Sequence, residues 1–218
     1  MSWHLRRKLV EYAIAMNDSG INQGTAGNLS MRCDDGMLIT PSSLEYTDIN
    51  PNNIVFVDDL GKTHDADRPS SEWRFHLDIY RQRPDAQAVL HAHPTYSTTL
   101  ACLNKPIPAF HYMVAVAGGK DIRCAPYATF GTQALSDHVI AALHGRKACL
   151  MDNHGLVCLE SDLARVLNLA IEVEQLARIY AQCLQIREPE ILSDGEMAEV
   201  VEKFKDYGAN APKPPRTW

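Results

Sequence analysis

Two histidines, His91 and His93, stand two residues apart directly after the apolar run Ala88-Val89-Leu90. That run predicts a buried strand, and side chains two apart on a strand point to the same face. Pro94 ends the strand, because proline can donate no ladder hydrogen bond. Two neutral imidazoles at a rigid strand end can form half of a site for a divalent metal. A histidine in a core can equally be satisfied by one hydrogen bond to a carbonyl, so further ligands are needed to decide.

A third imidazole, His154, stands in Asn153-His154-Gly155, between the apolar runs 148–151 and 156–158. We expect two buried strand pieces here, with a glycine-marked kink between them that presents His154. Three histidines leave a fourth position open, which is typical of a catalytic rather than a structural metal site. Nitrogen ligands without thiolates suit Zn²⁺, with Mn²⁺ or Co²⁺ as substitutes, and Glu72 can add a carboxylate. The other histidines give weaker signals: His4, His64, His138 and His144 in surface contexts, His76 inside a helix, and His111 undecided.

Three polar segments could bind an anion. Gly24–Ser30 contains two glycines three apart, so its turn can point N–H groups inward, with Asn28 as an added donor. The Ser42-Ser43 pair ends a predicted hairpin in a hydroxyl-rich loop. Pro69–Arg83 predicts a helix that one serine of the Ser70-Ser71 pair can cap, and a helix N-terminus with two hydroxyls is a natural phosphate site. Each of these patterns is also ordinary turn or helix-cap chemistry.

Length and composition bound the class of protein. The 218 residues are 45% hydrophobic, enough for a substantial core, and the net charge is −6. Without a basic cluster, nucleic-acid binding is not expected, and without an apolar run of about 20 residues neither is a membrane span. No signal-peptide core follows the start of the chain. The six scattered cysteines lack C-x-x-C spacing, which favours free thiols in a reducing cytoplasm.

Hydrophobic periodicity predicts one α/β domain, residues 1–208, followed by a mobile, Pro-rich tail at 209–218. We expect a central, mainly antiparallel sheet covered by helices. Apolar stripes and cap signals predict helices at 3–16, 69–83, 95–102, 133–143, 161–184 and 193–207. Strands are predicted at 31–40, as a hairpin, and at 54–57, 88–93, 148–151 and 156–158, while 106–113 is predicted to be extended.

Several motifs follow one another in a specific order: Gly24-Thr25-Ala26-Gly27-Asn28-Leu29-Ser30, Thr40-Pro41-Ser42-Ser43, Pro69-Ser70-Ser71-Glu72-Trp73, His91-Ala92-His93 and Asn153-His154-Gly155. The ordered set resembles the class II, zinc-dependent sugar-phosphate aldolase family, and within it the enzymes that act on L-fuculose 1-phosphate. The likeness spans nearly the whole chain except the last ten residues. It includes His111-Tyr112-Met113 and 124–132. Ser43 departs from the pattern, because glycine is common there.

The resemblance implies a class II aldolase/adducin-type fold and a homotetramer whose active sites lie between adjacent subunits. It also implies a zinc ion held by His91, His93 and His154. Glu72 would bind the resting metal and serve as the base. The implied phosphate cradle is Gly27, Asn28, Ser42, Ser43, Ser70 and Ser71.

Three aromatic residues complete the implied site. Tyr112 would be catalytic and would reach the site of a neighbouring subunit, as would Tyr207. Phe130 and Tyr207 would contact the substrate.

The family reaction is the reversible aldol cleavage of a ketose 1-phosphate. With L-fuculose 1-phosphate or a similar sugar, the products are dihydroxyacetone phosphate and a small aldehyde, L-lactaldehyde for fuculose. A 5-deoxyribulose or methylthioribulose 1-phosphate aldolase would break the same bond and release a different aldehyde. An epimerase of the same fold is disfavoured by Glu72 in place of aspartate and by Tyr112, and a methylthioribulose 1-phosphate dehydratase remains an alternative. The intact ligand set argues against a non-enzymatic, adducin-like interaction module.

Overall fold

The computed structural model of the protein describes residues 3–63 and 65–206, so His64 and the predicted tail at 209–218 lie outside it. The helices are α1 (Trp3–Asp18), α2 (Trp73–Gln82), α3 (Thr95–Cys102), the 3-10 helix η1 (Tyr112–Ala117), α4 (Gln133–Ala142), α5 (Leu163–Ile186) and α6 (Asp194–Asp206). The strands are β1 (Asn28–Cys33), β2 (Gly36–Ile39), β3 (Val55–Asp58), β4 (Ala88–Ala92), β5 (Arg123–Ala125), β6 (Ala148–Met151) and β7 (Gly155–Glu160).

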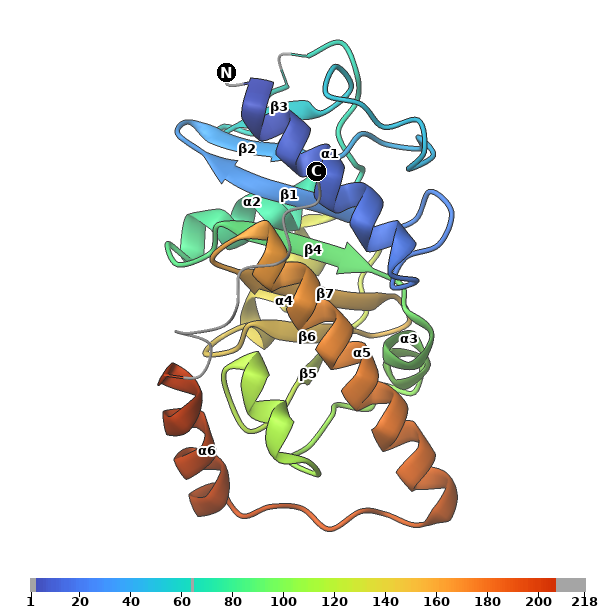
Figure 1. Ribbon diagram of the computed structural model, residues 1–218, viewed down its shortest axis with the longest axis vertical. Coiled ribbons are helices and arrows are strands. Elements are labelled where there is room, and N and C mark those ends of the chain that lie inside the picture. The colour runs from blue at the N-terminus through green and yellow to red at the C-terminus, as the bar shows by residue number, and fades with distance from the viewer. Residues whose placement is uncertain (1–2, 64, 207–218) are drawn as a thin grey trace, which may run out of the picture.

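The strands form one sheet in the order β3-β2-β1-β4-β7-β6-β5 (Figure 1). Neighbouring strands are antiparallel except β5 and β6, which run parallel. The α/β fold with a mainly antiparallel sheet covered by helices is therefore confirmed. β4 lies in the middle and pairs with β1 on one side and β7 on the other, so the strand that ends at His91 and His93 is held on both edges.

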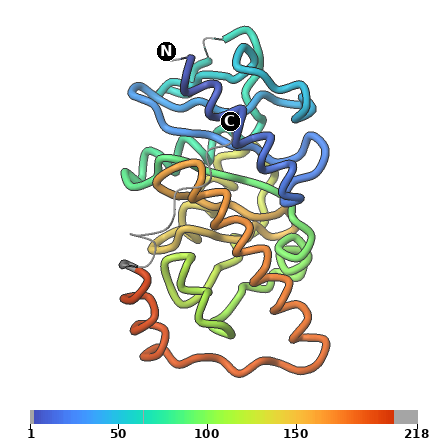
Figure 2. Tube along the Cα trace, viewed as in Figure 1, coloured from blue at the N-terminus to red at the C-terminus, as the bar shows by residue number. Residues whose placement is uncertain are grey.

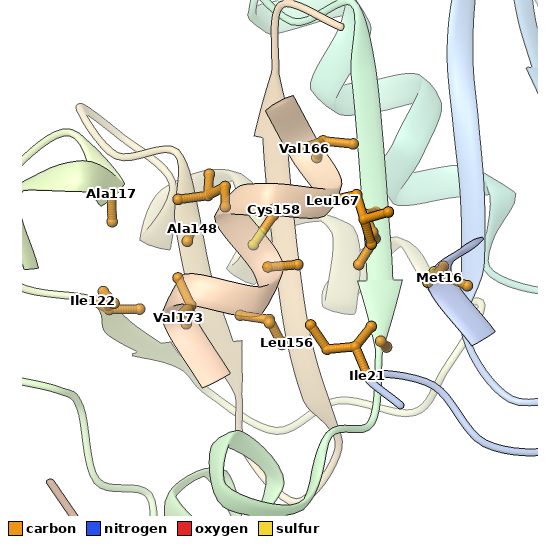
Figure 3. Close-up of a cluster of buried hydrophobic side chains, with 14 of the residues drawn as sticks. Met16, Ile21, Ala117, Ile122, Ala148, Leu156, Cys158, Val166, Leu167 and Val173 are labelled. Atoms are coloured by element: carbon orange, nitrogen blue, oxygen red, sulfur yellow. The ribbon is translucent and has the colours of Figure 1, made fainter. Parts of the chain in front are cut away.

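Helices cover both faces of this sheet, α1 and α5 on one side and α2 and α4 on the other (Figures 1 and 2). Side chains alternate along β4, so Leu90 joins the core beneath α5 while Val89 joins the core beneath α2. Val173 of α5 and Leu156 of β7 belong to the first of these cores (Figure 3). His91 shares the face of Val89, and its side chain is therefore directed toward α2 rather than α5.

The start of α2 differs from the sequence prediction. The helix begins at Trp73, Glu72 is its N-cap, and no side chain caps it, so the prediction of a Ser70 or Ser71 cap is wrong. A turn precedes the helix instead, in which the Trp73 N–H donates to the Ser70 carbonyl at 3.1 Å. Ser70 Oγ accepts a hydrogen bond from the Glu72 N–H at 3.3 Å. With this turn, the Glu72 carboxylate is directed toward the sheet and contacts His91 of β4.

The 148–160 region is a hairpin rather than a kinked strand. β6 and β7 pair antiparallel, and Asn153 in the connecting turn has a left-handed φ of 53°. His154 therefore lies in a turn at the end of the sheet. The sequence pattern showed two apolar runs with a glycine between them, which a kink and a turn satisfy equally well.

Two elements in the middle of the chain were not predicted. The segment at 106–113 ends in η1, whose first turn is stabilised when the Met113 N–H donates to His111 Nδ1 at 3.2 Å. β5 has three residues, too few for an alternating pattern to be visible.

Glu174 of α5 fixes the segment that follows His93. Its carboxylate accepts hydrogen bonds from the N–H groups of Tyr96 and Ser97 at 2.8 Å and from Ser97 Oγ at 2.7 Å. N–H groups at the start of a helix have no partner within the helix, so this carboxylate acts as the cap of α3. The backbone directly after His93 is thereby tied to α5.

Candidate metal centre and active site

Three histidine side chains converge at one end of the sheet. His91 lies near the end of β4, His93 directly follows that strand, and His154 comes from the β6–β7 turn. The ring centroids lie 4.7 Å apart for His91 and His93, 4.8 Å for His91 and His154, and 5.0 Å for His93 and His154. Each ring has one nitrogen that can serve as a ligand, and these three nitrogens lie within 4.8 Å of one another. They meet because β4 and β7 are neighbours and His154 directly precedes β7.

The backbone fixes the tautomer of His91. The ring is fully buried, and its Nδ1 lies 2.9 Å from the carbonyl oxygen of Leu156. A carbonyl can only accept, so Nδ1 carries the hydrogen and Nε2 of the neutral ring presents a lone pair. Nε2 lies 2.9 Å from His93 Nε2 and 3.0 Å from Glu72 Oε2. A carbonyl behind the other ring nitrogen is the usual support of a metal-binding histidine.

Glu72 is the anionic member of the group. Its side chain is buried, with Oε2 at 3.0 Å from His91 Nε2 and Oε1 at 3.2 Å from His154 Nε2. Burial opposes ionisation, but the neighbouring His91 and His154 imidazoles hold the pKa of this carboxyl well below its usual range. Burial also opposes protonation of His91, while the Glu72 carboxylate raises the pKa of that ring. An ionised carboxylate therefore faces the imidazoles.

These donors fit a divalent cation. With Nδ1 of His91 protonated, the lone pairs of His91 Nε2 and Glu72 Oε2 face each other, which requires a proton or a cation between them. Apart from the contact with His154 Nε2 at 3.2 Å, the buried Glu72 Oε1 has no hydrogen-bond partner in the described part of the chain. Burial and the two neighbouring imidazoles lower the pKa of His93 to about 4, so its ring is neutral at pH 7 and can act as a ligand. Nitrogen and carboxylate donors of this kind suit Zn²⁺.

A cavity of about 360 Å³ adjoins the histidines. Glu72, His93 and His154 form one wall. The other lining residues are Thr25, Ala26, Gly27, Asn28, Pro41, Ser42, Ser43, Ser70, Ser71 and Phe130. No lysine or arginine lines it within the described ranges, so an anion here would be held by neutral N–H and hydroxyl groups.

Backbone geometry explains two positions of the cavity wall. Gly27 has φ +72°, and a Cβ there would lie 2.7 Å from the His91 carbonyl oxygen and 2.3 Å from Asn22 Oδ1, so a side chain does not fit. Ser43 has a left-handed φ of 59°, a conformation that glycine adopts more readily. Its hydroxyl lies 3.3 Å from Ser42 Oγ, which places two hydroxyls side by side.

The predicted site residues fall into three groups. The six positions of the expected phosphate cradle all line the cavity, and so does Phe130, which is 62% exposed. Tyr112 is not among the described residues that line it, because it begins η1, where its half-exposed ring stacks on His111 at 4.9 Å between centroids. Tyr207 lies outside the described residues.

The sequence analysis did not connect His76 with the site. Its ring is fully buried, with Nε2 at 2.5 Å from Asn28 Oδ1 and Nδ1 at 2.7 Å from Ser30 Oγ. One signal was available: Glu72, His76 and Tyr80 recur every four residues, which places them on one side of a helix.

Comparison with known proteins identifies the family. Residues 7–181 match the model described as the class II aldolase and adducin N-terminal domain. The chain belongs to this family. It is 56% identical to the 5-methylthioribulose-1-phosphate/5-deoxyribulose-1-phosphate aldolase of Rhodospirillum rubrum, over 97% of this chain and 96% of the relative. It is 52% identical to the L-fuculose phosphate aldolase of Escherichia coli strain K12, over 94% of this chain and 95% of the relative.

A solved structure supports the same assignment to the class II aldolases. An L-fuculose 1-phosphate aldolase superposes with a TM-score of 0.91 at 41% identity, over 94% of this chain and 98% of that chain. The family resemblance and the aldolase class predicted from the motifs are therefore confirmed.

None of the helices in the described ranges is long and apolar enough to cross a membrane.

Proposed function

We propose that this class II aldolase cleaves a ketose 1-phosphate reversibly to dihydroxyacetone phosphate and a small aldehyde. The supporting observation is a cavity with imidazoles and a buried carboxylate on one wall and hydroxyls and a glycine turn on the others. The first wall suits a divalent cation and the others suit a phosphate, so a sugar carrying both a ketone and a phosphate would be held at two points. Two relatives are named for 5-deoxyribulose or methylthioribulose 1-phosphate and for L-fuculose phosphate.

The metal is proposed to be zinc, with manganese or cobalt as substitutes, held by His91, His93 and His154, with Glu72 on the resting ion. When bound, the ion supplies the positive charge that stabilises the enediolate electrons left when the C3–C4 bond breaks. No lysine lines the described cavity wall, so a Schiff base does not enter the proposal.

Two residues of the chain are proposed to move protons. Glu72 would transfer the proton at C3 of the dihydroxyacetone phosphate half. Tyr112 would exchange a proton with the oxygen that becomes the aldehyde. Because Tyr112 is exposed in η1 and does not line its own cavity, we propose that it acts from the adjacent subunit of a homotetramer, with Tyr207 and Phe130 as further substrate contacts.

The phosphate is proposed to bind to Gly27, Asn28, Ser42, Ser43, Ser70 and Ser71. These groups are neutral, so they would fix the phosphate without placing a competing cation near the metal. We further propose that residues 1–208 form a single domain. The enzyme would work in the cytoplasm, where its six cysteines, free in the structure, stay reduced.

L-Fuculose 1-phosphate is the leading substrate, and 5-deoxyribulose and methylthioribulose 1-phosphates are the alternatives. A panel of these three sugars separates them. The zinc-loaded protein should release dihydroxyacetone phosphate, measured by coupled reduction with NADH, and the ratios of kcat/KM identify the preferred aldehyde. Activity that survives a chelator, or no release from any of the three, would contradict the proposal.

The role of Glu72 has its own test. Glu72→Gln should abolish tritium exchange from dihydroxyacetone phosphate while zinc remains bound to the three histidines. The exposed Glu45→Gln is the matched control and should leave both exchange and zinc content unchanged. Exchange retained in Glu72→Gln would mean that another group carries the proton.

A further inference from the structure

A buried chain of hydrogen bonds leads from α2 through β1 to Glu72. The Tyr80 hydroxyl lies 2.8 Å from Ser30 Oγ, and Ser30 Oγ lies 2.7 Å from His76 Nδ1. His76 Nε2 lies 2.5 Å from Asn28 Oδ1, and Asn28 Nδ2 donates to Glu72 Oε2 at 3.0 Å. All five residues are buried, so water does not compete for these bonds.

Two regular spacings in the sequence place the five hydrogen-bonded residues next to one another. Glu72, His76 and Tyr80 recur every four residues and lie along one side of α2. Asn28 and Ser30 are two apart on β1 and point to the same face of the sheet. The helix row and the strand row therefore interleave, and each side chain of one row contacts a neighbour in the other.

The hydrogens in this chain have one consistent direction. Asn28 Nδ2 donates to Glu72, so the amide oxygen of Asn28 faces His76, and an amide oxygen can only accept. His76 Nε2 must then carry a hydrogen. Burial lowers the pKa of His76 to about 3, so the ring is neutral at pH 7 and Nδ1 accepts from the Ser30 hydroxyl. Ser30 in turn accepts from Tyr80, and every donor points toward the carboxylate.

We infer that His76 is a positioning residue for the aldol reaction. Held as the Nε2–H tautomer, it fixes the amide of Asn28, and through it the orientation of the Glu72 carboxylate. This inference rests on the proposed role of Glu72 as proton carrier. Asn28 also lines the cavity in the predicted phosphate cradle, so the same amide links the carboxylate wall to the anion wall.

A purely structural role makes a different prediction. His76 stacks on Phe75 with ring centroids 4.7 Å apart, so its ring also fills the core beneath the sheet. If packing were its whole contribution, an aromatic replacement of similar size would preserve function. If the Nε2–H is what matters, only a side chain that places a donor at the same point will do so.

Three substitutions separate the two roles. The amide nitrogen of His76→Gln lies where Nε2 was and can donate to Asn28, whereas the nitrogen of His76→Asn lies where Nδ1 was and cannot reach it. His76→Phe keeps the ring and removes both nitrogens. We expect His76→Asn and His76→Phe to lower the rate of tritium exchange by about 10- to 100-fold, as loss of supporting hydrogen bonds does. His76→Gln should restore most of that loss.

The readouts must exclude a general loss of structure. Zinc content and Tm are measured for each variant, and exchange rates are compared only between variants that match in both. Asn28→Ala provides the second arm, because adding His76→Asn to it should cost little more if His76 acts through Asn28. Equal losses in His76→Gln and His76→Asn, or full exchange in His76→Phe, would overturn the inference.

A spectroscopic measurement tests the tautomer in the wild-type protein itself. The ¹⁵N signals of the His76 ring, assigned by their absence in His76→Gln, should show a protonated Nε2 and an unprotonated Nδ1 near neutral pH. An Nδ1–H ring or an imidazolium would overturn the inference even if the variants were inactive. If the wild-type protein neither cleaves a ketose 1-phosphate nor exchanges tritium, the proposed function fails, and this spectrum still decides the direction of the hydrogen bonds.

Discussion

Gly155 tests whether the metal centre depends on close packing around His93. A Cβ at this position would lie 2.5 Å from the Ala92 carbonyl oxygen and 2.8 Å from His93 Cδ2. Contacts of a Cβ below 3.0 Å are essentially not seen in folded proteins. Gly155→Ala therefore has to displace the end of β4 or the imidazole by about 0.5 Å. Gly155 is not one of the positive-φ glycines, so the effect is steric and not conformational.

The size of the effect follows from that displacement. Overpacking of this kind costs about 1–3 kcal/mol of stability, and each kcal/mol lowers the Tm of a chain of this length by about 2–4 °C. Ligands need to be held within about 0.5 Å of their working positions. We therefore expect zinc affinity to fall by about 10- to 100-fold, the usual loss when the support of a ligand is disturbed.

The assay is a competition for zinc against a chromophoric chelator, with Tm measured by circular dichroism. Gly195→Ala is the matched control, because a Cβ there meets nothing closer than Ser193 Oγ at 4.0 Å. The control should keep the zinc affinity of the parent protein. If Gly155→Ala folds normally and binds zinc as tightly as the control, the reasoning that links this packing to the metal centre is wrong.

Three further outcomes are expected. Burial opposes ionisation of Asp78, but hydrogen-bond donors, led by the Ser136 hydroxyl at 2.7 Å, lower the pKa of this carboxyl. Ionised Asp78 therefore stabilises the fold at pH values above the ordinary carboxyl pKa. This stabilisation is lost as the pH falls through the lowered pKa. Asp78→Asn should cost about 1–3 kcal/mol in urea unfolding at neutral pH, with the difference shrinking in acid. Glu174→Ala should cost a similar amount, because the start of α3, including Ser97, loses its acceptor. Tyr112→Phe should slow ketose cleavage far more than tritium exchange, and equal losses would assign it a structural role.

Local periodicity was enough to predict most of the fold and the metal group. Strand alternation placed His91 and His93 on one face, and the glycine after His154 indicated a break between two strand pieces. The helix predicted at 95–102 agrees with α3 in its bounds, although the acceptor at its start is the distant Glu174 carboxylate and not a local side chain. The cradle residues were identified by resemblance, and their lining of one cavity depends on loops that the pattern alone could not bring together.

Long-range pairing explains what was missed. His76 looked like an ordinary helical residue because its partner Asn28 lies 48 positions away, on β1. The β1–β4 register also places Asn28 opposite His91, which no local spacing encodes. The start of α2 was predicted too early because Ser70 has cap chemistry, yet its backbone forms a turn that turns Glu72 toward the sheet.

The two walls of the cavity rest on different kinds of backbone. The wall formed by Glu72, His93 and His154 is supported by β4, which His93 directly follows and which pairs with β1 on one edge and β7 on the other, so hydrogen exchange in β4 should be slow with or without a bound metal ion. Much of the anion wall consists of loops around Gly27 and Ser43, which lie outside the strands and have left-handed φ values. Ordering entropy on substrate binding should therefore be lost mainly at the anion wall, and the affinity for the phosphate group can change there while the geometry around the ion stays fixed.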